Sequence, residues 1–154
     1  MSFANSIRFL KHIHRRINQA LNRVILITMT EAKSKALLVE DDPFMAALLS
    51  EGLVKEGFEI ILADNGEDAV AKFKGSKYDV ILMDILLPKK NGIEALAEIR
   101  LLPGGEKIPA LIISNIEEAG YINEAEKLGV KAYLIKANTQ IPDIVAKVKE
   151  VLKS

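Results

Sequence analysis

Four short apolar runs in this chain each end on a polar residue, and those polar residues are of the types that one catalytic or metal site needs. The runs end at Glu40-Asp41, at Asp84, at Ser114 and at Lys136. Apolar runs of this length are typical of strands that are buried on both faces of a parallel sheet. Ligands of such sheets bind outside the carboxyl ends of the strands, so we expect three acids, a hydroxyl and an ammonium group to converge there.

The three acids form a donor set suited to a hard cation. Glu40, Asp41 and Asp84 would repel one another by several kcal/mol if they were gathered within a few ångström. Mg²⁺ would relieve this repulsion, because it prefers oxygen ligands and is held by carboxylates, waters and a substrate phosphate. Glu40-Asp41-Asp42-Pro43 also fits a helix N-terminus, where acids complement the helix dipole. We assign that capping role to Asp42, and the matching Asp84 favours a metal site for the other two acids.

A carboxylate beside Mg²⁺, a hydroxyl and an ammonium group predicts phosphoryl transfer onto an aspartate. Asp84 is the expected nucleophile, because a carboxylate at a strand end is exposed to ligands and supported by a rigid core. Lys136 and the cation would balance charge on the transferring group, and Ser114 would donate a hydrogen bond to it. The chain has no Gly-x-x-x-x-Gly-Lys-Ser/Thr loop, so the phosphoryl donor must come from another molecule.

The order of the predicted elements is a fivefold strand–helix alternation. Strands are expected over 36–40, 58–63, 78–83, 109–113 and 131–135, and helices over 43–56 and near 67–74, 93–101, 117–127 and 140–152. Units of this length require parallel strands with right-handed crossovers. The expected fold is α/β, a doubly wound five-stranded parallel sheet of the flavodoxin-like type with strand order 2-1-3-4-5. In the helix at 43–56 we expect Phe44, Leu48, Leu49 and Leu53 to face inward.

The first 30 residues differ from the domain expected at 35–154. An apolar stripe with helical spacing runs through them, made of Phe3, Ile7, Leu10, His14, Ile17, Leu21 and Val24. Residues 1–28 carry a net charge of +5, which leaves −5 on the remainder. Three interpretations stay open: a dimerising or docking helix, a membrane-surface helix, and a non-native extension ahead of a start at Met29.

The composition narrows the class of protein. A length of 154 residues indicates one domain. The absence of cysteine excludes disulfides and thiol catalysis and agrees with a reducing cytoplasm, where we expect the protein to act. No apolar stretch approaches 18 residues, so we expect no transmembrane helix. Membrane association is the least favoured of the three interpretations of the N-terminal segment. A net charge of zero does not indicate direct nucleic-acid binding.

Over residues 35–153 the chain resembles a bacterial response-regulator receiver domain of the stand-alone, chemotaxis-regulator-like kind. The resemblance rests on Leu37–Pro43, Tyr78–Gly92, the strand that ends at Ser114, and Ala132–Lys136. It implies a phosphoacceptor signalling domain of a two-component system, which is not an enzyme and at most catalyses its own phosphorylation and dephosphorylation. The implied phosphoryl donor is a sensor histidine kinase or a phosphotransfer protein, and the implied output is contact with an unidentified downstream protein.

The resemblance also implies a role for each site residue. Asp84 would be the phosphoacceptor, and Glu40, Asp41, Asp84 and the Leu86 backbone carbonyl would bind Mg²⁺. Ser114 would be the switch hydroxyl and Lys136 the phosphoryl-stabilising lysine. Tyr133 would be the aromatic residue that swings inward when the hydroxyl engages the phosphoryl group. A dimer through the last helix or through the N-terminal helix is compatible with this interpretation.

Two positions depart from the family pattern. Ala137 follows Lys136 where a proline with a cis peptide bond is usual, and Asn115 follows Ser114 where a small residue is usual. A non-proline cis bond costs about 3 kcal/mol, so we expect a trans bond and a changed turn. The alternative function is therefore a receiver-like adaptor that does not switch. A haloacid-dehalogenase-like phosphatase is disfavoured, because Glu40 stands where that family needs its nucleophilic aspartate, two residues before Asp42.

Overall fold

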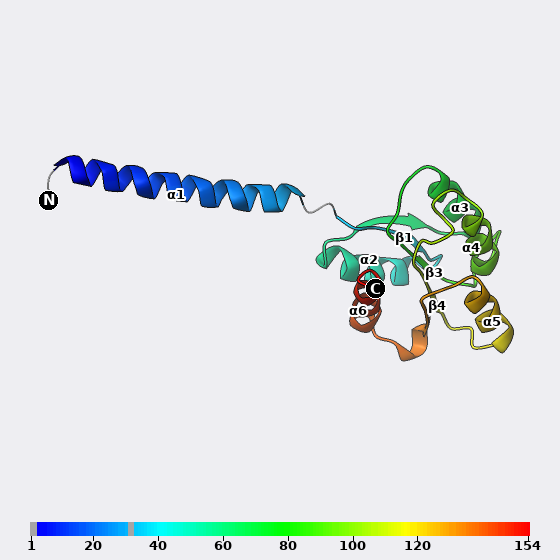
Figure 1. The fold of residues 1–154 in the computed structure, drawn as a ribbon. Helices are drawn as coiled ribbons and strands as arrows, with labels where there is room; N and C mark the ends of the chain where they lie inside the picture. The colour runs from blue at the N-terminus through cyan, green and yellow to red at the C-terminus, as the bar shows by residue number, and fades with distance from the viewer. Residues whose placement is uncertain (1–2, 31–32) are drawn as a thin grey trace. The chain divides into compact units, whose positions relative to one another are not determined.

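The computed structural model of the chain describes residues 3–30 and 33–154, and side chains within 10–23 and 33–154. The chain divides into two compact units, Met1–Lys33 and Ser34–Ser154. The first unit contains helix α1 (Phe3–Thr30). The second contains the sheet and the other helices (Figure 1).

Five parallel strands form one sheet in the second unit. They are β1 (Lys35–Val39), β2 (Glu59–Ala63), β3 (Val80–Met83), β4 (Ala110–Ser114) and β5 (Ala132–Ile135). Their order is β2-β1-β3-β4-β5, which confirms the predicted flavodoxin-like topology. The central strands β3 and β4 are buried along their whole length, whereas the edge strands β2 and β5 are partly exposed. This burial explains why the central runs are uniformly apolar rather than alternating.

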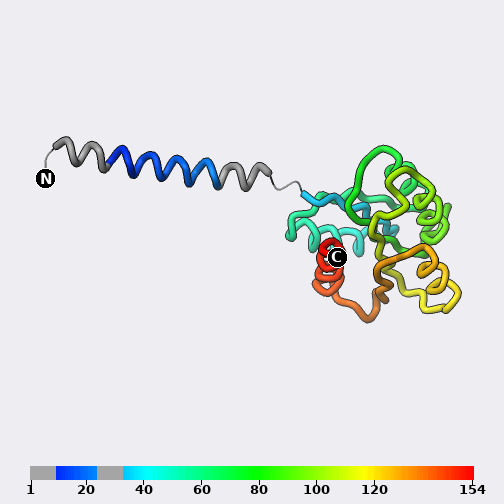
Figure 2. The backbone as a smooth tube through the Cα atoms, in the orientation of Figure 1, coloured from blue at the N-terminus to red at the C-terminus, as the bar shows by residue number. Residues whose placement is uncertain are grey.

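Helices cover both faces of the sheet. Helices α2 (Pro43–Lys55) and α6 (Ile141–Val151) pack on one face, and α3 (Gly66–Lys74), α4 (Gly92–Arg100) and α5 (Ala119–Lys127) pack on the other. Figures 1 and 2 show this division, with the red C-terminal helix beside α2. Successive residues of a strand point to opposite faces of the sheet, so each of the two helical layers packs on a core of its own. The strands thus become a rigid frame with their carboxyl ends in one row.

The N-termini of α2, α3 and α4 at this row are capped by side chains. The Asp42 Oδ1 atom accepts hydrogen bonds from the backbone N–H of Phe44 at 2.8 Å and of Met45 at 3.2 Å, ahead of Pro43 in the first turn. The capping role assigned to Asp42 is confirmed. At α4, Asn91 and Glu94 form a reciprocal capping box. Because Asp42 caps α2, Glu40 and Asp41 are not needed as caps of this helix.

The inward orientation expected for Phe44 is wrong. Leu49 and Leu53 are fully buried, and Leu48 is partly buried, but 68% of the Phe44 surface is exposed. Phe44 lies five residues before Leu49, which places it about 140° away around the helix. Leu49, rather than Phe44, therefore defines the side of α2 that faces the sheet.

Helix α1 carries an exposed apolar stripe within its described side chains. Leu10, Ile17 and Leu21 are each more than half exposed, and Ile13 is exposed to a smaller extent. Phe3, Ile7 and Val24 lie outside the residues whose side chains are described, so the stripe predicted there stays a prediction. Within the described ranges no helix is both long and apolar enough to cross a bilayer.

Deletion of residues 1–28 is expected to leave a folded domain. The two core clusters that the described residues form are built from residues between Ala36 and Leu152. We expect the melting temperature of the truncated protein to lie within about 4 °C of the full chain, the shift that ~1 kcal/mol produces at this size. Thermal unfolding and size-exclusion chromatography would check this. Insolubility, or loss of cooperative unfolding, would show that the helix is needed by the domain.

Candidate functional site

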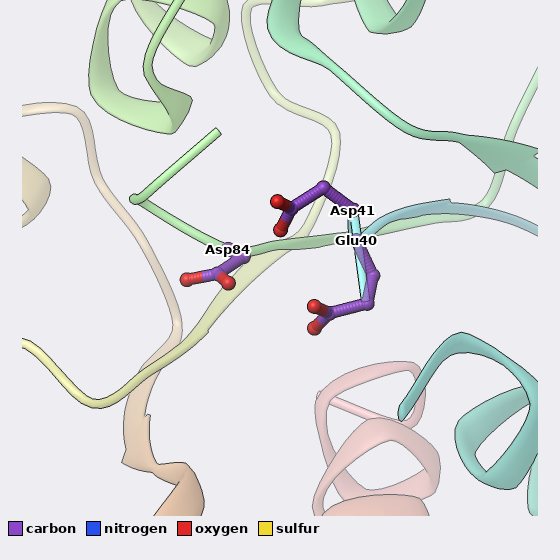
Figure 3. A group of neighbouring side chains, drawn as sticks. All are labelled: Glu40, Asp41 and Asp84. Carbon is purple, nitrogen blue, oxygen red and sulfur yellow. The ribbon is translucent and has the colours of Figure 1, made fainter. Parts of the chain in front are cut away.

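Strand register brings the acidic residues together. Val39 pairs with Met83, so the next residues, Glu40 and Asp84, leave adjacent strands side by side. The Asp84 backbone N–H donates to the Val39 carbonyl at 3.0 Å. One carboxylate oxygen from each of Glu40, Asp41 and Asp84 lies within 4.8 Å of the other two. Figure 3 shows the three side chains gathered where β1 and β3 end. The structure therefore forms the acidic cluster expected from the sequence.

Lys136 joins two of these acids. Its Nζ atom lies 2.6 Å from Glu40 Oε2 and 2.6 Å from Asp84 Oδ2. The lysine side chain is only 12% exposed, and the two carboxylates are less exposed still. Hydrogen bonds between charged groups in such a site are short and strong. One ammonium group nevertheless balances only part of the charge of three carboxylates.

The pKa values of Glu40 and Lys136 reflect both their burial and the ion pair between them. Burial raises the pKa of Glu40 above its ordinary value, although Lys136 acts in the opposite direction. Burial also disfavours the ammonium form of Lys136, but its bonds to Asp84 and Glu40 prevail and raise its pKa. Lys136 is therefore a permanent cation at neutral pH. A second positive charge would further stabilise the ionised form of Glu40.

The Asp84 residue is held by backbone contacts. Asp84 Oδ1 accepts a hydrogen bond from the Ile85 N–H at 2.6 Å. The Ile85 carbonyl in turn accepts from the Gly92 N–H at 2.9 Å. A Cβ at Gly92 would lie 1.9 Å from the Asp84 carbonyl oxygen, so only glycine allows this approach of α4 to the end of β3. These contacts fix the Asp84 backbone and leave its Oδ2 toward Lys136.

Ser114 and Tyr133 contact the loop that follows β4. Ser114 is buried at the end of β4, and its Oγ accepts a long hydrogen bond from the Ile116 N–H at 3.4 Å. The Tyr133 hydroxyl donates to the Ile116 carbonyl at 2.7 Å. Burial, with a smaller contribution from Asp84, raises the pKa of Tyr133 above its ordinary value, so its hydroxyl keeps the proton. The roles assigned to these two residues stay predictions.

The two departures from the family pattern are in direct contact. The Ala137 backbone N–H donates to Asn115 Oδ1 at 2.8 Å. No cis peptide bond occurs in residues 3–30 or 33–154, so the bond from Lys136 to Ala137 is trans. Lys136 still reaches both Glu40 and Asp84. Sequence reasoning considered Asn115 and Ala137 separately, although the pairing of the strands that precede them would place them close together.

The donor set suits Mg²⁺. All three acidic ligands offer hard carboxylate oxygens, and no sulfur or imidazole donor is among them. Glu40 and Asp84 are buried, whereas Asp41 is exposed and leaves the cluster open to solvent. The predicted Leu86 ligand is a backbone carbonyl two residues after Asp84, and the Leu86 side chain is exposed at this edge. The cluster thus has the oxygen chemistry and the access that a hydrated cation requires.

The sheet is flavodoxin-like, and three acids and a lysine lie at its carboxyl edge. These features are typical of one class of signalling domain, which carries an acidic pocket at this edge of the sheet. A family model of the response regulator receiver domain matches residues 36–149. The chain belongs to this receiver family, as its sequence predicted. Receiver domains are two-component signalling domains that interact with histidine kinases or phosphotransfer proteins and with downstream targets.

Relatives and solved structures agree with this membership. The chemotaxis protein CheY of Thermotoga maritima is 36% identical over 103 residues, which are 66% of this chain and 84% of that protein. A crystal structure of the phosphorylated cyanobacterial phytochrome response regulator RcpA has a TM-score of 0.70 at 30% identity, covering 80% of this chain and 96% of that one. The receiver domain of the sensor histidine kinase PA1611 from Pseudomonas aeruginosa PAO1 has a TM-score of 0.72 at 28% identity, covering 80% and 100%, and contains a magnesium ion in its active-site cleft.

Proposed function

We propose that this protein is a phosphorylation-switched receiver that accepts a phosphoryl group on Asp84. The donor would be the phosphohistidine of a sensor histidine kinase or a phosphotransfer protein, and the output would be contact with another protein. The observation that carries the proposal is the position of Lys136, whose ammonium group touches both Asp84 and Glu40 at 2.6 Å. A lysine held in this way balances charge at the acceptor carboxylate, where phosphoryl transfer is driven by positioning and charge neutralisation.

The transfer exchanges one bond to phosphorus for another. A carboxylate oxygen of Asp84 forms the new O–P bond, the N–P bond of the phosphohistidine breaks, and its electron pair stays on the imidazole. Mg²⁺, bound by Glu40, Asp41, Asp84 and the Leu86 carbonyl, would neutralise negative charge on the phosphoryl oxygens. Lys136 contributes its fixed positive charge on the side of the Asp84 Oδ2 atom.

The phosphorylated aspartate would act through the loop after β4. Phosphorylation adds roughly −1.5 to −2 charges and three acceptor oxygens. Ser114, whose present hydrogen bond is 3.4 Å long, is expected to donate to one of these oxygens instead. Tyr133 contacts the same loop through Ile116, so movement of the loop changes the position of this aromatic ring. The altered face would be the surface that a downstream protein recognises.

Phosphorylation by a small donor tests the proposal. The full chain would be incubated with acetyl phosphate, with and without Mg²⁺, and its phosphorylated fraction measured by Phos-tag electrophoresis and intact-protein mass spectrometry. We expect a gain of one phosphoryl group that requires Mg²⁺ and is reversed by hydroxylamine, which cleaves acyl phosphates. A chain that gains no phosphoryl group with acetyl phosphate or a phosphohistidine donor would instead be the non-switching adaptor.

Replacement of Asp41 by alanine is expected to weaken Mg²⁺ binding by roughly tenfold or more, equivalent to ~1.4 kcal/mol. Asp41 is the exposed acid of the cluster, so its removal takes away a cation ligand without leaving a buried cavity. Magnesium titration by isothermal calorimetry would measure the affinity. The control is Glu126→Ala, which removes an exposed acid on α5. If both variants bind Mg²⁺ like the wild type, Asp41 is not a ligand.

A further inference from the structure

The turn that carries Lys136 has few internal restraints. Lys136 begins the short 3₁₀ helix η1 (Lys136–Asn138), which contains no buried residue and has no side-chain cap. At its C-terminal end, the Thr139 N–H reaches the Lys136 carbonyl only at 3.5 Å, and Thr139 Oγ1 donates to the Ile135 carbonyl at 2.8 Å. A long, flexible side chain starts from this turn and must keep its ammonium group between two buried carboxylates.

A side chain from the loop after β4 restrains the backbone of this turn. Asn115 follows β4, and its Oδ1 accepts the Ala137 N–H at 2.8 Å. The hydrogen bond is possible only because residue 137 has an N–H, which proline lacks. Ala137 therefore provides the donor and Asn115 the acceptor of one hydrogen bond, and the two departures from the family pattern depend on each other.

We propose that Asn115 is a positioning residue for Lys136. By holding the Ala137 backbone it fixes the direction in which Lys136 leaves η1, and so keeps the ammonium group on Glu40 and Asp84. This inference rests on the proposed function and deepens it, because the positioned ammonium group acts on the acceptor aspartate. Asn115 itself does not touch the reacting atoms.

The same contact joins the lysine to the switch residues. Asn115 stands between Ser114, whose Oγ contacts the Ile116 N–H, and Ile116, whose carbonyl holds the Tyr133 hydroxyl. The loop after β4 is thus attached to β5 by Tyr133 and to η1 by Ala137. When Ser114 moves toward a phosphoryl group, the backbone of the lysine turn is expected to move with it. Ser114, Tyr133 and Lys136 would then respond as one unit.

The test compares Asn115→Ala with two matched variants. Asn115→Asp keeps an acceptor oxygen for the Ala137 N–H, and Asn138→Ala removes an exposed amide from the same turn, where the described structure records no hydrogen bond for it. Three readouts are used: hydrogen exchange of the Ala137 amide, the ¹⁵N-detected signal of the Lys136 ammonium group, and the rate of phosphorylation by acetyl phosphate with Mg²⁺. The first two are measured without a phosphoryl donor.

We expect Asn115→Ala to expose the Ala137 amide to exchange, to broaden or shift the Lys136 ammonium signal, and to slow phosphorylation about three- to tenfold, the factor given by one ordinary hydrogen bond. Asn115→Asp should retain amide protection and the lysine signal, and Asn138→Ala should change none of the three. In an Ala137→Pro background, where the donor is gone, Asn115→Ala should have no further effect on the lysine signal.

Two results would overturn the inference. One is an unchanged Lys136 ammonium signal in Asn115→Ala. The other is that Asn115→Ala changes this signal equally whether residue 137 is alanine or proline. These outcomes differ from failure of the proposed function. If the wild type gains no phosphoryl group, the exchange and lysine readouts still decide whether Asn115 positions Lys136.

Discussion

Replacement of Asp84 by asparagine is expected to abolish phosphoryl acceptance while the fold is kept. Asparagine has nearly the same shape, and its side-chain oxygen can still accept the Ile85 N–H that now bonds Asp84 Oδ1. It lacks the anionic oxygen that forms the acyl phosphate. The variant also relieves part of the repulsion among three clustered acids. We expect no detectable phosphorylated species on Phos-tag gels, with far-ultraviolet circular dichroism unchanged.

The sharpest control for this variant is Asp64→Asn. Asp64 also follows a strand at the carboxyl edge of the sheet, but it is exposed after the edge strand β2. Its side chain accepts from Asn65 at 2.6 Å, a contact that an asparagine oxygen can keep. We expect Asp64→Asn to be phosphorylated like the wild type. If Asp84→Asn were still phosphorylated and Asp64→Asn were not, the acceptor would lie after β2 instead of after β3. This result would contradict our proposal.

Replacement of Gly92 by alanine is expected to destabilise the domain by about 3 kcal/mol. This value is near the upper end of the usual loss of stability when an extra group is forced into a well-packed site. The added methyl group would lie 1.9 Å from the Asp84 carbonyl oxygen and 2.9 Å from Met83 Cγ. A backbone oxygen cannot move aside without moving Asp84 itself. Urea unfolding would measure the loss of stability, and we expect the phosphorylation rate of the folded fraction to fall as well.

Gly120→Ala is the matched control for the glycine experiment. Gly120 lies in α5, and a Cβ there would meet no heavy atom within 4 Å. Alanine is favoured over glycine in a helix, so this variant should gain up to roughly 1 kcal/mol of stability. Similar effects at the two positions would show that close approach to Asp84 is not what requires glycine at position 92.

The topology was predictable because it depends on patterns that are local in the sequence. The uniformly apolar β3 and β4 and the helical segments between strands leave few arrangements other than a parallel, doubly wound sheet. The orientation of Phe44 was mispredicted, because an apolar residue in the first turn of a helix is not obliged to face the core. The short helix η1 was also missed, since no apolar repeat or cap marks Lys136–Asn138.

The roles of the site residues were suggested by residue type, but their relations depend on contacts between distant segments. Nothing in the order of residues states that the Lys136 ammonium group bridges Glu40 and Asp84, which are 96 and 52 positions away along the chain. The bond between Asn115 and Ala137 is likewise absent from any local pattern. Each contact exists because pairing of β1 with β3, of β3 with β4 and of β4 with β5 sets the register of their ends.

The order of the residues is enough to say which chemical groups stand at the ends of the strands, because burial makes each strand apolar and the first polar residue marks where it leaves the core. It thereby determined the family and the acidic, oxygen-rich character of the pocket. The tertiary structure alone decided which groups touch. Strand register places Glu40 beside Asp84, and the turn after β5 directs Lys136 onto both. Those distances arise from packing between segments far apart in the chain, which no local pattern encodes.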